Sequence, residues 1–169
     1  MRYGLILGLI CLLAAGLLAG MNSLTKNRII LQAQAEEQAS LKEVVPRAAR
    51  FEPVKSDKRE ILYYNGYDQD GKLAAVAFKA LAKGYSSPIE TMAGMTKDGT
   101  IIAIMVLSQN ETPGLGARIT EKEFGSRFSN KKNLDDVQAI SGATISSQAV
   151  IDSVKNKAEE IKGLISNAK

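Results

Sequence analysis

Ser141-Gly142-Ala143-Thr144-Ile145-Ser146-Ser147 is the stretch that decides how this chain is organised, because it joins a turn of small residues to a helical pattern. The pattern runs to about Ser166 with Ser146 or Ser147 as the expected cap, and its apolar positions share one face: Val150, Val154, Ile161 and Ile165. The first turn of a helix has unpaired N–H groups and the positive end of the helix dipole. The stretch therefore predicts an anion site suited to phosphate, with a plain Ser/Thr helix cap as the alternative.

The composition excludes several functions. The 22 Lys and Arg against 18 Asp and Glu give a net charge of +4, but these residues are scattered and aromatics make up only 5%, so we expect no nucleic-acid binding. The absence of His removes the usual general base and the commonest metal ligand. Cys11, the one cysteine, cannot by itself hold an iron–sulfur cluster or a structural zinc. We therefore predict no catalytic side chain and no metal site, and redox chemistry would need an organic cofactor.

The N-terminal segment is predicted to be a membrane anchor. Residues 3–25 contain no charged side chain, and about 20 such residues in a helix span the roughly 30 Å hydrocarbon core of a bilayer. A cleaved signal peptide is the alternative, but the apolar run is longer than a usual signal, and Leu17 and Leu18 stand where cleavage needs small residues. We therefore predict an uncleaved transmembrane anchor over 1–25.

A helical spacer or linker over 26–60, ended by Pro46 and Pro53, is predicted to join the anchor to a folded domain over 61–169. The domain should contain a short helix over 121–128 before the last one. The fold class is accordingly α/β: a mixed α+β domain with antiparallel hairpins, preceded by one N-terminal transmembrane helix.

Two predicted hairpins open the domain. Strands 61–67 and 73–81 meet at Asp70-Gly71, and strands 89–96 and 100–107 meet at Asp98-Gly99. Both have a glycine five residues before the turn glycine, a shared spacing that we attribute to hairpin geometry. Residues 101–107 are apolar on both faces, which predicts a central strand that is covered on both sides.

Glu111-Thr112-Pro113-Gly114-Leu115-Gly116 follows that apolar strand as a tight loop. Pro113 presets a turn, and the glycines permit positive φ or close approach of the backbone. Glu111, Thr112 and Leu115 would project from a rigid loop at the end of a strand, which is a favoured place for a ligand site. A well-formed turn without a ligand is the alternative.

Four motifs and the apolar N-terminus together resemble the G subunit of Rnf-type ion-translocating electron transport complexes and, more distantly, the C subunit of the sodium-translocating NADH:quinone oxidoreductase. The motifs are Lys83-Gly84-Tyr85-Ser86-Ser87-Pro88-Ile89, the Asp98-Gly99 hairpin, the Glu111–Gly116 loop and Ala139–Ser147. The resemblance covers most of the chain.

This resemblance implies a flavoprotein that carries electrons within a membrane complex. FMN would be attached covalently, through its phosphate, to Thr144 by a flavin transferase. Other implied cofactor contacts are Ser141, Gly142, Ala143, Ser146 and Ser147 at the phosphate, and Glu111, Thr112 and Leu115 at the ring system. The partners would be other membrane subunits of the complex, and the domain would lie on the extracytoplasmic side of the inner or plasma membrane, held by a single span.

Two positions depart from the family pattern. Gln138 stands where the family usually has Asp, three residues before the Ser of the motif, and Ser108-Gln109-Asn110 stands where a His is common. The first departure motivates the alternative of a non-flavinylated structural subunit that serves assembly. A third alternative is a free-standing flavin-dependent reductase of the envelope, which is disfavoured because no acid or base accompanies the site.

Overall fold

The computed structural model describes residues 2–56 and 60–167. By its internal contacts the chain divides into two compact units, one that ends at Gln38 and one that begins at Ala39. Helix α1 (Arg2–Val44) supplies the first unit and continues into the second. By length and composition it is the one helix in the described ranges that could cross a membrane. The predicted apolar N-terminal helix is thereby confirmed, and it runs on without a break until just before Pro46.

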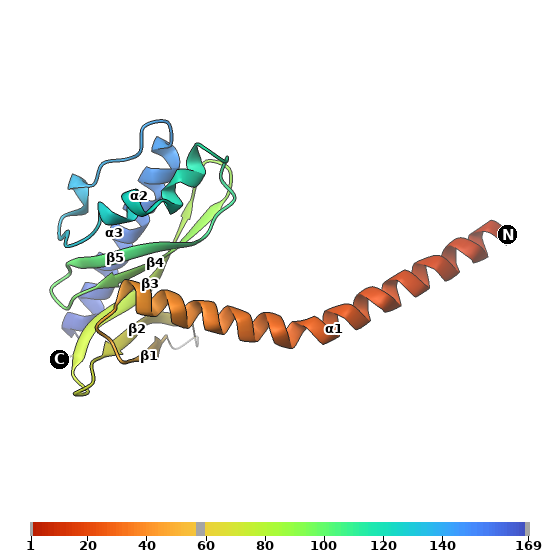
Figure 1. Ribbon diagram of the computed structural model, residues 1–169, viewed down its shortest axis with the longest axis horizontal. Coiled ribbons are helices and arrows are strands. Elements are labelled where there is room, and N and C mark those ends of the chain that lie inside the picture. The colour runs from red at the N-terminus through yellow and green to blue at the C-terminus, as the bar shows by residue number, and fades with distance from the viewer. Residues whose placement is uncertain (1, 57–59, 168–169) are drawn as a thin grey trace. The chain divides into compact units, whose positions relative to one another are not determined.

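A five-stranded antiparallel sheet forms the body of the second unit, in the order β1-β2-β3-β4-β5 (Figure 1). The strands are β1 (Arg50–Lys55), β2 (Ile61–Tyr67), β3 (Leu73–Lys83), β4 (Pro88–Met95) and β5 (Ile101–Ser108). Both predicted hairpins are confirmed, and their turn glycines, Gly71 and Gly99, have φ values of 74° and 92°. Each neighbour in sequence is therefore a neighbour in the sheet, which confirms the predicted mixed α/β class with antiparallel hairpins.

Two strand predictions differ from the structure. The sheet starts at Arg50 rather than near Ile61. Pro53 was expected to lie outside the strands, but it lies in β1, an edge strand, where a residue without an N–H can stand without loss of a hydrogen bond to a neighbouring strand. The expectation that β5 is central is wrong: β5 pairs only with β4 and forms the other edge. Its apolar sequence has a different cause. Helix α2 (Lys122–Ser126) contacts β5, and Lys131 bridges to Ile101 at its start. The strand is half-buried along most of its length.

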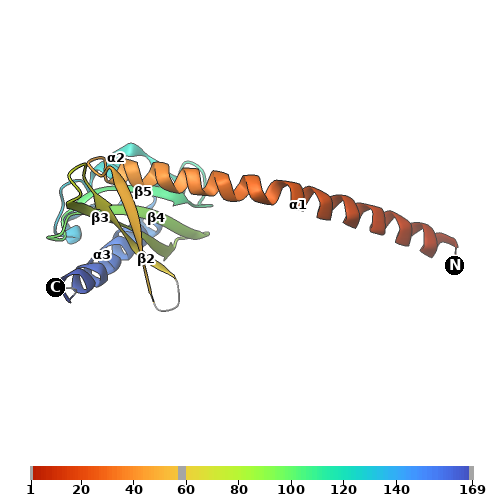
Figure 2. The same ribbon diagram turned by 90° about the horizontal axis from the view of Figure 1, so that it is seen from below.

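Apolar side chains fill both faces of the sheet. Helix α3 (Thr144–Asn167) lies against one face (Figures 1 and 2) and contributes its predicted stripe to a large core. Buried members of this core include Val76, Phe78, Ile89, Met95, Phe124, Phe128, Val150, Val154 and Ile161. A smaller core on the other face joins the end of α1 and the residues after it to the sheet: Leu41, Val44, Val45, Ala48, Tyr64, Ala75, Ala77 and Met92.

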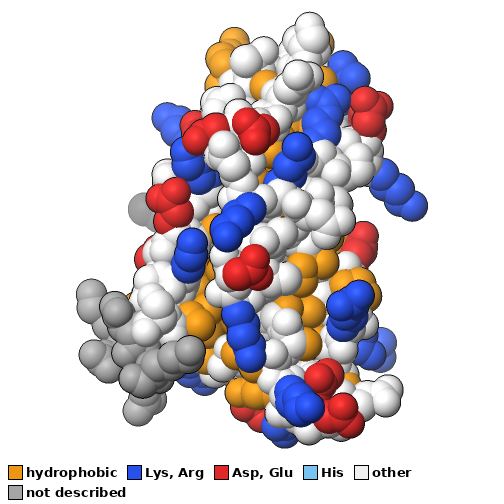
Figure 3. Space-filling view, turned by 90° about the vertical axis from the view of Figure 1, so that its left-hand side faces the viewer, with side chains coloured by type: hydrophobic (Ala, Val, Ile, Leu, Met, Phe, Trp, Pro, Cys, Tyr) orange, Lys and Arg blue, Asp and Glu red, His pale blue; other side chains and the backbone are white. Residues whose placement is uncertain are grey.

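Charged side chains of both signs are interspersed over the face drawn in Figure 3. Such a mixed surface is usual for a domain in contact with water. The polar groups that define a site lie at the end of the sheet where the β3–β4 turn, the loop after β5 and the start of α3 meet.

Candidate functional site

The turn at 141–147 is built around Ser147. Its buried hydroxyl accepts a hydrogen bond from the Ile140 N–H (3.1 Å) and donates one to the Ala143 carbonyl (2.7 Å). Gly142 has a φ of 81°, a conformation that favours glycine. Helix α3 therefore begins at Thr144, and Ser147 closes the turn from within the first helical turn instead of standing before it.

Thr144 stands at the first helical position with an exposed side chain. The first hydrogen bond of the helix runs from the Ser147 N–H to the Ala143 carbonyl (2.9 Å). The N–H groups of Thr144, Ile145 and Ser146 consequently have no partner within the helix. One hydroxyl and three N–H groups are thus available at the positive end of the α3 dipole.

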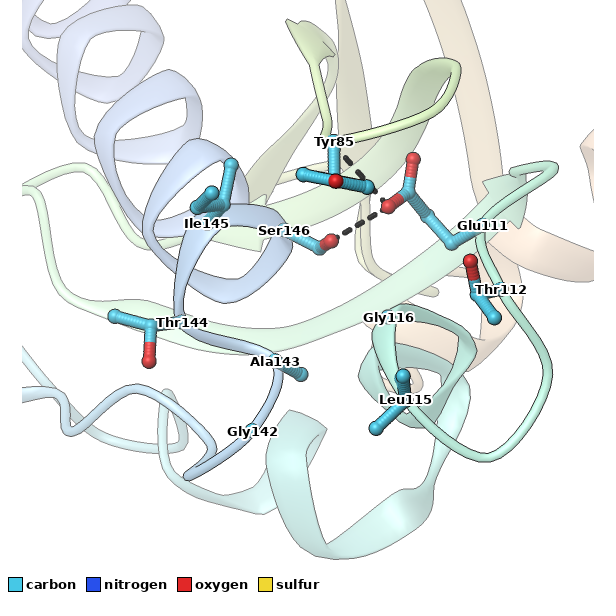
Figure 4. Close-up of a pocket in the computed structure, with 10 residues that line it drawn as sticks. All are labelled: Tyr85, Glu111, Thr112, Leu115, Gly116, Gly142, Ala143, Thr144, Ile145 and Ser146. Carbon is cyan, nitrogen blue, oxygen red and sulfur yellow. Dashed lines mark hydrogen bonds between the residues drawn. The ribbon is translucent and has the colours of Figure 1, made fainter.

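A pocket of about 380 Å³ opens beside this turn (Figure 4). The turn and the start of α3 form one wall, and the Glu111–Gly116 loop and the β3–β4 turn form the other. Its lining residues are Tyr85, Glu111, Thr112, Leu115, Gly116, Gly142, Ala143, Thr144, Ile145 and Ser146. Segments that are far apart in sequence therefore face a common cavity.

Glu111 joins the walls of this pocket. Its side chain is buried, and its carboxylate accepts hydrogen bonds from the N–H groups of Tyr85 (3.2 Å), Ser86 (2.9 Å) and Ser87 (2.9 Å). It also accepts one from the Ser146 hydroxyl (2.6 Å), the contact drawn in Figure 4. Burial raises the pKa of Glu111, but the bonds from Ser146, Ser87, Ser86 and Tyr85 together outweigh it and hold the pKa below its ordinary value. The carboxylate is therefore ionised at neutral pH.

Three large apolar side chains stand exposed around the pocket. Tyr85 is 71% exposed, Leu115 53% and Ile145 58%. Single exposed apolar residues are ordinary, but three that line one cavity indicate a surface for an apolar ligand group. The pocket thus combines an apolar rim with donors suited to an anion.

Seven of the nine predicted site residues line the pocket: Glu111, Thr112, Leu115, Gly142, Ala143, Thr144 and Ser146. Ser141 and Ser147 do not. The Ser147 hydroxyl is engaged inside the turn, while the Ser141 carbonyl accepts a hydrogen bond from Arg118 (3.5 Å).

Tyr85, Ile145 and Gly116 line the pocket but were not predicted as site residues. Ile145 lies off the apolar stripe of α3, and a large apolar residue in that position was a usable signal. Tyr85 belongs to the motif at 83–89, whose spacing does not indicate which side chain faces a ligand. Gly116 has no side chain from which a role could be inferred.

A guanidinium group also holds the segment that leads into the turn. Arg127 donates to the carbonyls of Gln138 (2.9 Å) and Ala139 (3.4 Å). The Gln138 side chain is exposed. Within residues 2–56 and 60–167, no group of three His, Cys, Asp or Glu side chains could hold a metal ion.

Comparison with known proteins places this geometry among flavin-binding domains. The family model described as an FMN-binding domain matches residues 84–159, a range that contains every pocket residue. A second model, described as the RnfG N-terminal region, matches residues 1–44.

Two relatives show how far the similarity extends. The G subunit of an ion-translocating oxidoreductase complex from Methanosarcina acetivorans is 38% identical over 164 residues, which is 88% of this chain and 87% of that protein. The G subunit of a proton-translocating ferredoxin:NAD(+) oxidoreductase complex from Clostridium ljungdahlii is also 38% identical, over 53% of this chain and 55% of that protein.

Among solved structures, the crystal structure of NqrC from Shewanella oneidensis has a TM-score of 0.52 at 22% identity, over 71% of this chain and 74% of that one. At this identity the likeness concerns the fold alone.

Proposed function

The chain belongs to the family of G subunits of Rnf-type ion-translocating oxidoreductase complexes, and from this premise we propose that Thr144 carries a covalently attached FMN. The chain is an electron-transport subunit of such a complex, with an FMN-binding domain and an apolar helix that associates it with the membrane. The attachment, the residues that contact the flavin and the side of the membrane are parts of our proposal.

The pocket supports FMN binding by its size and its lining. Its volume of about 380 Å³ lies within the range of roughly 300–1,000 Å³ common for small-molecule sites. Tyr85, Leu115 and Ile145 offer an apolar surface to a flat ring system. The unpaired N–H groups at the start of α3 offer donors to a phosphate. The residues present therefore fit this cofactor.

In the proposed attachment, the Thr144 hydroxyl loses its proton, its Oγ bonds to the phosphorus of the FMN phosphate, and the bond from that phosphorus to the substituent it carried breaks, so that the substituent leaves with the proton. The modified chain gains one FMN less one water, in a step that we assign to a flavin transferase. When bound, FMN supplies the redox chemistry that the side chains lack. The chain binds and orients it: the first turn of α3 holds the phosphate, Ser141 to Ala143 shape the turn, and Thr112 and Leu115 border the ring.

The single observation that carries this proposal is the placement of Thr144. Thr144 is the first residue of α3, its side chain is exposed, and it lines a pocket within the matched FMN-binding range. A phosphoester there would lie in the favourable field of the helix N-terminus.

We assign the domain to the extracytoplasmic side of the inner or plasma membrane, with the other subunits of an Rnf-type complex as partners. A covalent bond is useful there because a dissociated cofactor would be lost from the cell. Labelling of intact cells with a membrane-impermeant reagent tests this assignment, and protection of the domain in intact cells would contradict it.

Intact mass tests the attachment. Full-length protein co-expressed with a flavin transferase should gain the mass of one FMN less one water. Thr144→Ala should abolish the gain, whereas Thr120→Ala, which removes an exposed hydroxyl outside the pocket, should keep it. The proposal would be contradicted if the wild-type chain kept its unmodified mass, or if Thr144→Ala still gained the mass of one FMN less one water.

Gln138 motivates a second candidate, a subunit without flavin that serves assembly. The Gln138 side chain is exposed and uncharged where the family usually has Asp, so a transferase that needs that carboxylate would leave Thr144 unmodified. If only Gln138→Asp gains the FMN mass, the assembly role is favoured for the natural chain.

A further inference from the structure

The contacts of Glu111 suggest a different role from that of a flavin ligand. We propose that Glu111 is a positioning residue that locks the turn bearing Thr144 to the opposite wall of the pocket and does not itself contact the ligand. The effect of this turn on flavin attachment rests on the proposed function. We call the hydrogen bonds of Glu111 with residues 85–87 and with Ser146 the lock, and these bonds are present in the chain without cofactor.

The carboxylate oxygens are already saturated by the protein. Oε1 accepts from the N–H groups of Ser86 and Ser87 (both 2.9 Å) and from the Ser87 hydroxyl (3.3 Å). Oε2 accepts from the Tyr85 N–H (3.2 Å) and the Ser146 hydroxyl (2.6 Å). An ionised carboxylate offers about four acceptor sites, so no capacity is left for a ligand donor.

Two glycines confine the same carboxylate. A Cβ at Gly84 would lie 2.6 Å from Oε1, and a Cβ at Gly116 would lie 2.7 Å from Oε2 and 2.8 Å from the Ser146 hydroxyl oxygen. A Cβ at Gly84 would also lie 2.6 Å from Ile89 Cδ1, and a Cβ at Gly116 would also lie 2.9 Å from the Glu111 Cβ. Both glycines therefore leave room for the Glu111 side chain, and Gly84 leaves room for Ile89 as well.

The Ser87 hydroxyl adds another tie between the β3–β4 turn and the loop. It accepts a hydrogen bond from the Asn110 N–H (2.7 Å), and its one proton is shared between Glu111 Oε1 and the Pro88 carbonyl (both 3.3 Å). The carboxylate and its neighbours thus join the turn at 84–87, the loop after β5 and the first turn of α3. These are the segments whose side chains line the pocket.

Ser146 transmits this arrangement to Thr144. The two residues lie in the same first turn of α3, so a fixed Ser146 hydroxyl fixes the orientation of the turn that presents the Thr144 hydroxyl. Leu115 on the opposite wall lies four residues after Glu111 in the same loop. Without the carboxylate, the two walls would lose their common anchor and the spacing between Thr144 and Leu115 would vary.

Glu111→Gln is the direct test, because it keeps the shape but replaces one accepting oxygen with an NH₂ group. Amide hydrogen exchange of the full-length, unmodified chain in detergent should then accelerate at least tenfold at 85–87 and at 147–150, where the N–H groups are hydrogen-bonded, and stay unchanged in β1 and β2. The initial rate of flavin attachment by the transferase should fall at least tenfold. Glu52→Gln, which removes an exposed carboxylate from β1, is the matched control.

Ser146→Ala is a smaller change to the same lock, because it removes only the hydrogen bond from the Ser146 hydroxyl to Glu111. Exchange should accelerate at 147–150 but not at 85–87, and attachment should slow. Its control is Ser153→Ala, which removes a helix hydroxyl bonded to the Val150 carbonyl (3.0 Å). If Glu111→Gln fails to fold, Ser146→Ala decides the question.

Unchanged exchange at the turn in the deciding variant, or attachment at the wild-type rate, would overturn the lock. If the wild-type chain takes up no flavin while exchange responds as expected, the lock stands and the proposed function fails. The two hypotheses are thus separated by one set of variants. The absorption and circular dichroism of the attached flavin add a readout that a loss of stability alone would not change.

Discussion

Three of the four hydroxyls in the turn at 141–147 have different roles, and each role depends on the neighbours of the hydroxyl in space. Ser147 is buried and closes the backbone turn, Ser146 bonds to Glu111, and Thr144 is exposed to the pocket. Helix-cap chemistry and ligand-site chemistry were alternatives for the stretch as a whole. The predicted cap at Ser146 or Ser147 is wrong, because α3 begins at Thr144 and both serines lie within its first turn. Thr144 lines the pocket with an exposed side chain.

The lowered pKa of Glu111 predicts a pH dependence of stability. A carboxyl whose pKa is lower in the folded state than its unfolded value of about 4.3 stabilises the fold fully above that value. The stabilisation is lost as the pH falls through the folded pKa. The difference in thermal midpoint between wild type and Glu111→Gln should therefore be constant from pH 7 to about 5 and shrink below about 4.3.

Thermal scans of both chains in one detergent at a series of pH values check this expectation. Hydrogen bonds with Thr96 and Thr100 also hold the pKa of Asp98 low, so Asp98 contributes to the pH dependence of both chains. The difference between the two thermal midpoints removes this shared contribution and leaves that of Glu111. A difference that grows on acidification would contradict the assignment of an ionised carboxylate.

At the scale of elements, the shared spacing of the two hairpins has a structural cause. Gly71 and Gly99 form the turns, while Gly66 and Gly94, five residues earlier, each precede a register shift in their strand. A Cβ at Gly94 would lie 2.2 Å from the Val44 carbonyl oxygen, and a Cβ at Gly66 would lie 3.0 Å from Cβ of Ala48. Both glycines therefore make room for the end of α1 and the chain after it.

Gly94→Ala should lower the free energy of unfolding by about 1–3 kcal/mol, the usual cost of overpacking, because the methyl group would displace Val44 from the sheet. Gly163→Ala is the matched control. Gly163 lies in α3 with open space around its Cβ position, so alanine there should stabilise by about 0.5–1 kcal/mol. Denaturant unfolding measures both, and a neutral Gly94→Ala would contradict the close contact.

At the scale of the whole molecule, the compact unit that begins at Ala39 defines what should fold without the anchor. Removal of residues 1–38 takes away a helical segment whose large apolar side chains, where the structure describes them, are exposed, and should leave a folded, soluble protein. Removal of 1–49 also takes away buried Leu41, Val44 and Val45 and uncovers one face of the sheet.

The longer truncation should cost several kcal/mol, at roughly 1.5–3 kcal/mol for each fully buried aliphatic side chain. Size-exclusion chromatography and thermal denaturation of the two fragments compare them directly. Equal stability would show that the segment 39–49 contributes nothing to the domain.

The sequence by itself determined the elements and their local order. Alternation and turn glycines predicted four of the five strands, and helical spacing predicted the buried stripe of α3. These patterns are readable because they depend on residues close together in the chain. The loop and the turn were also recognisable as motifs, and the family they predicted is the one to which the chain belongs.

Only the tertiary structure decided which groups meet. Glu111 and Ser146 are 35 residues apart, and no local pattern indicates that one side chain accepts from the other. The apolar sequence of β5 predicts a central strand, but β5 lies at an edge of the sheet. Contact with α2 buries its side chains too, and the same apolar residues would be found in a strand between two others. Hydrogen-bond partners and sheet edges depend on contacts between distant segments, and those contacts form only when the chain packs.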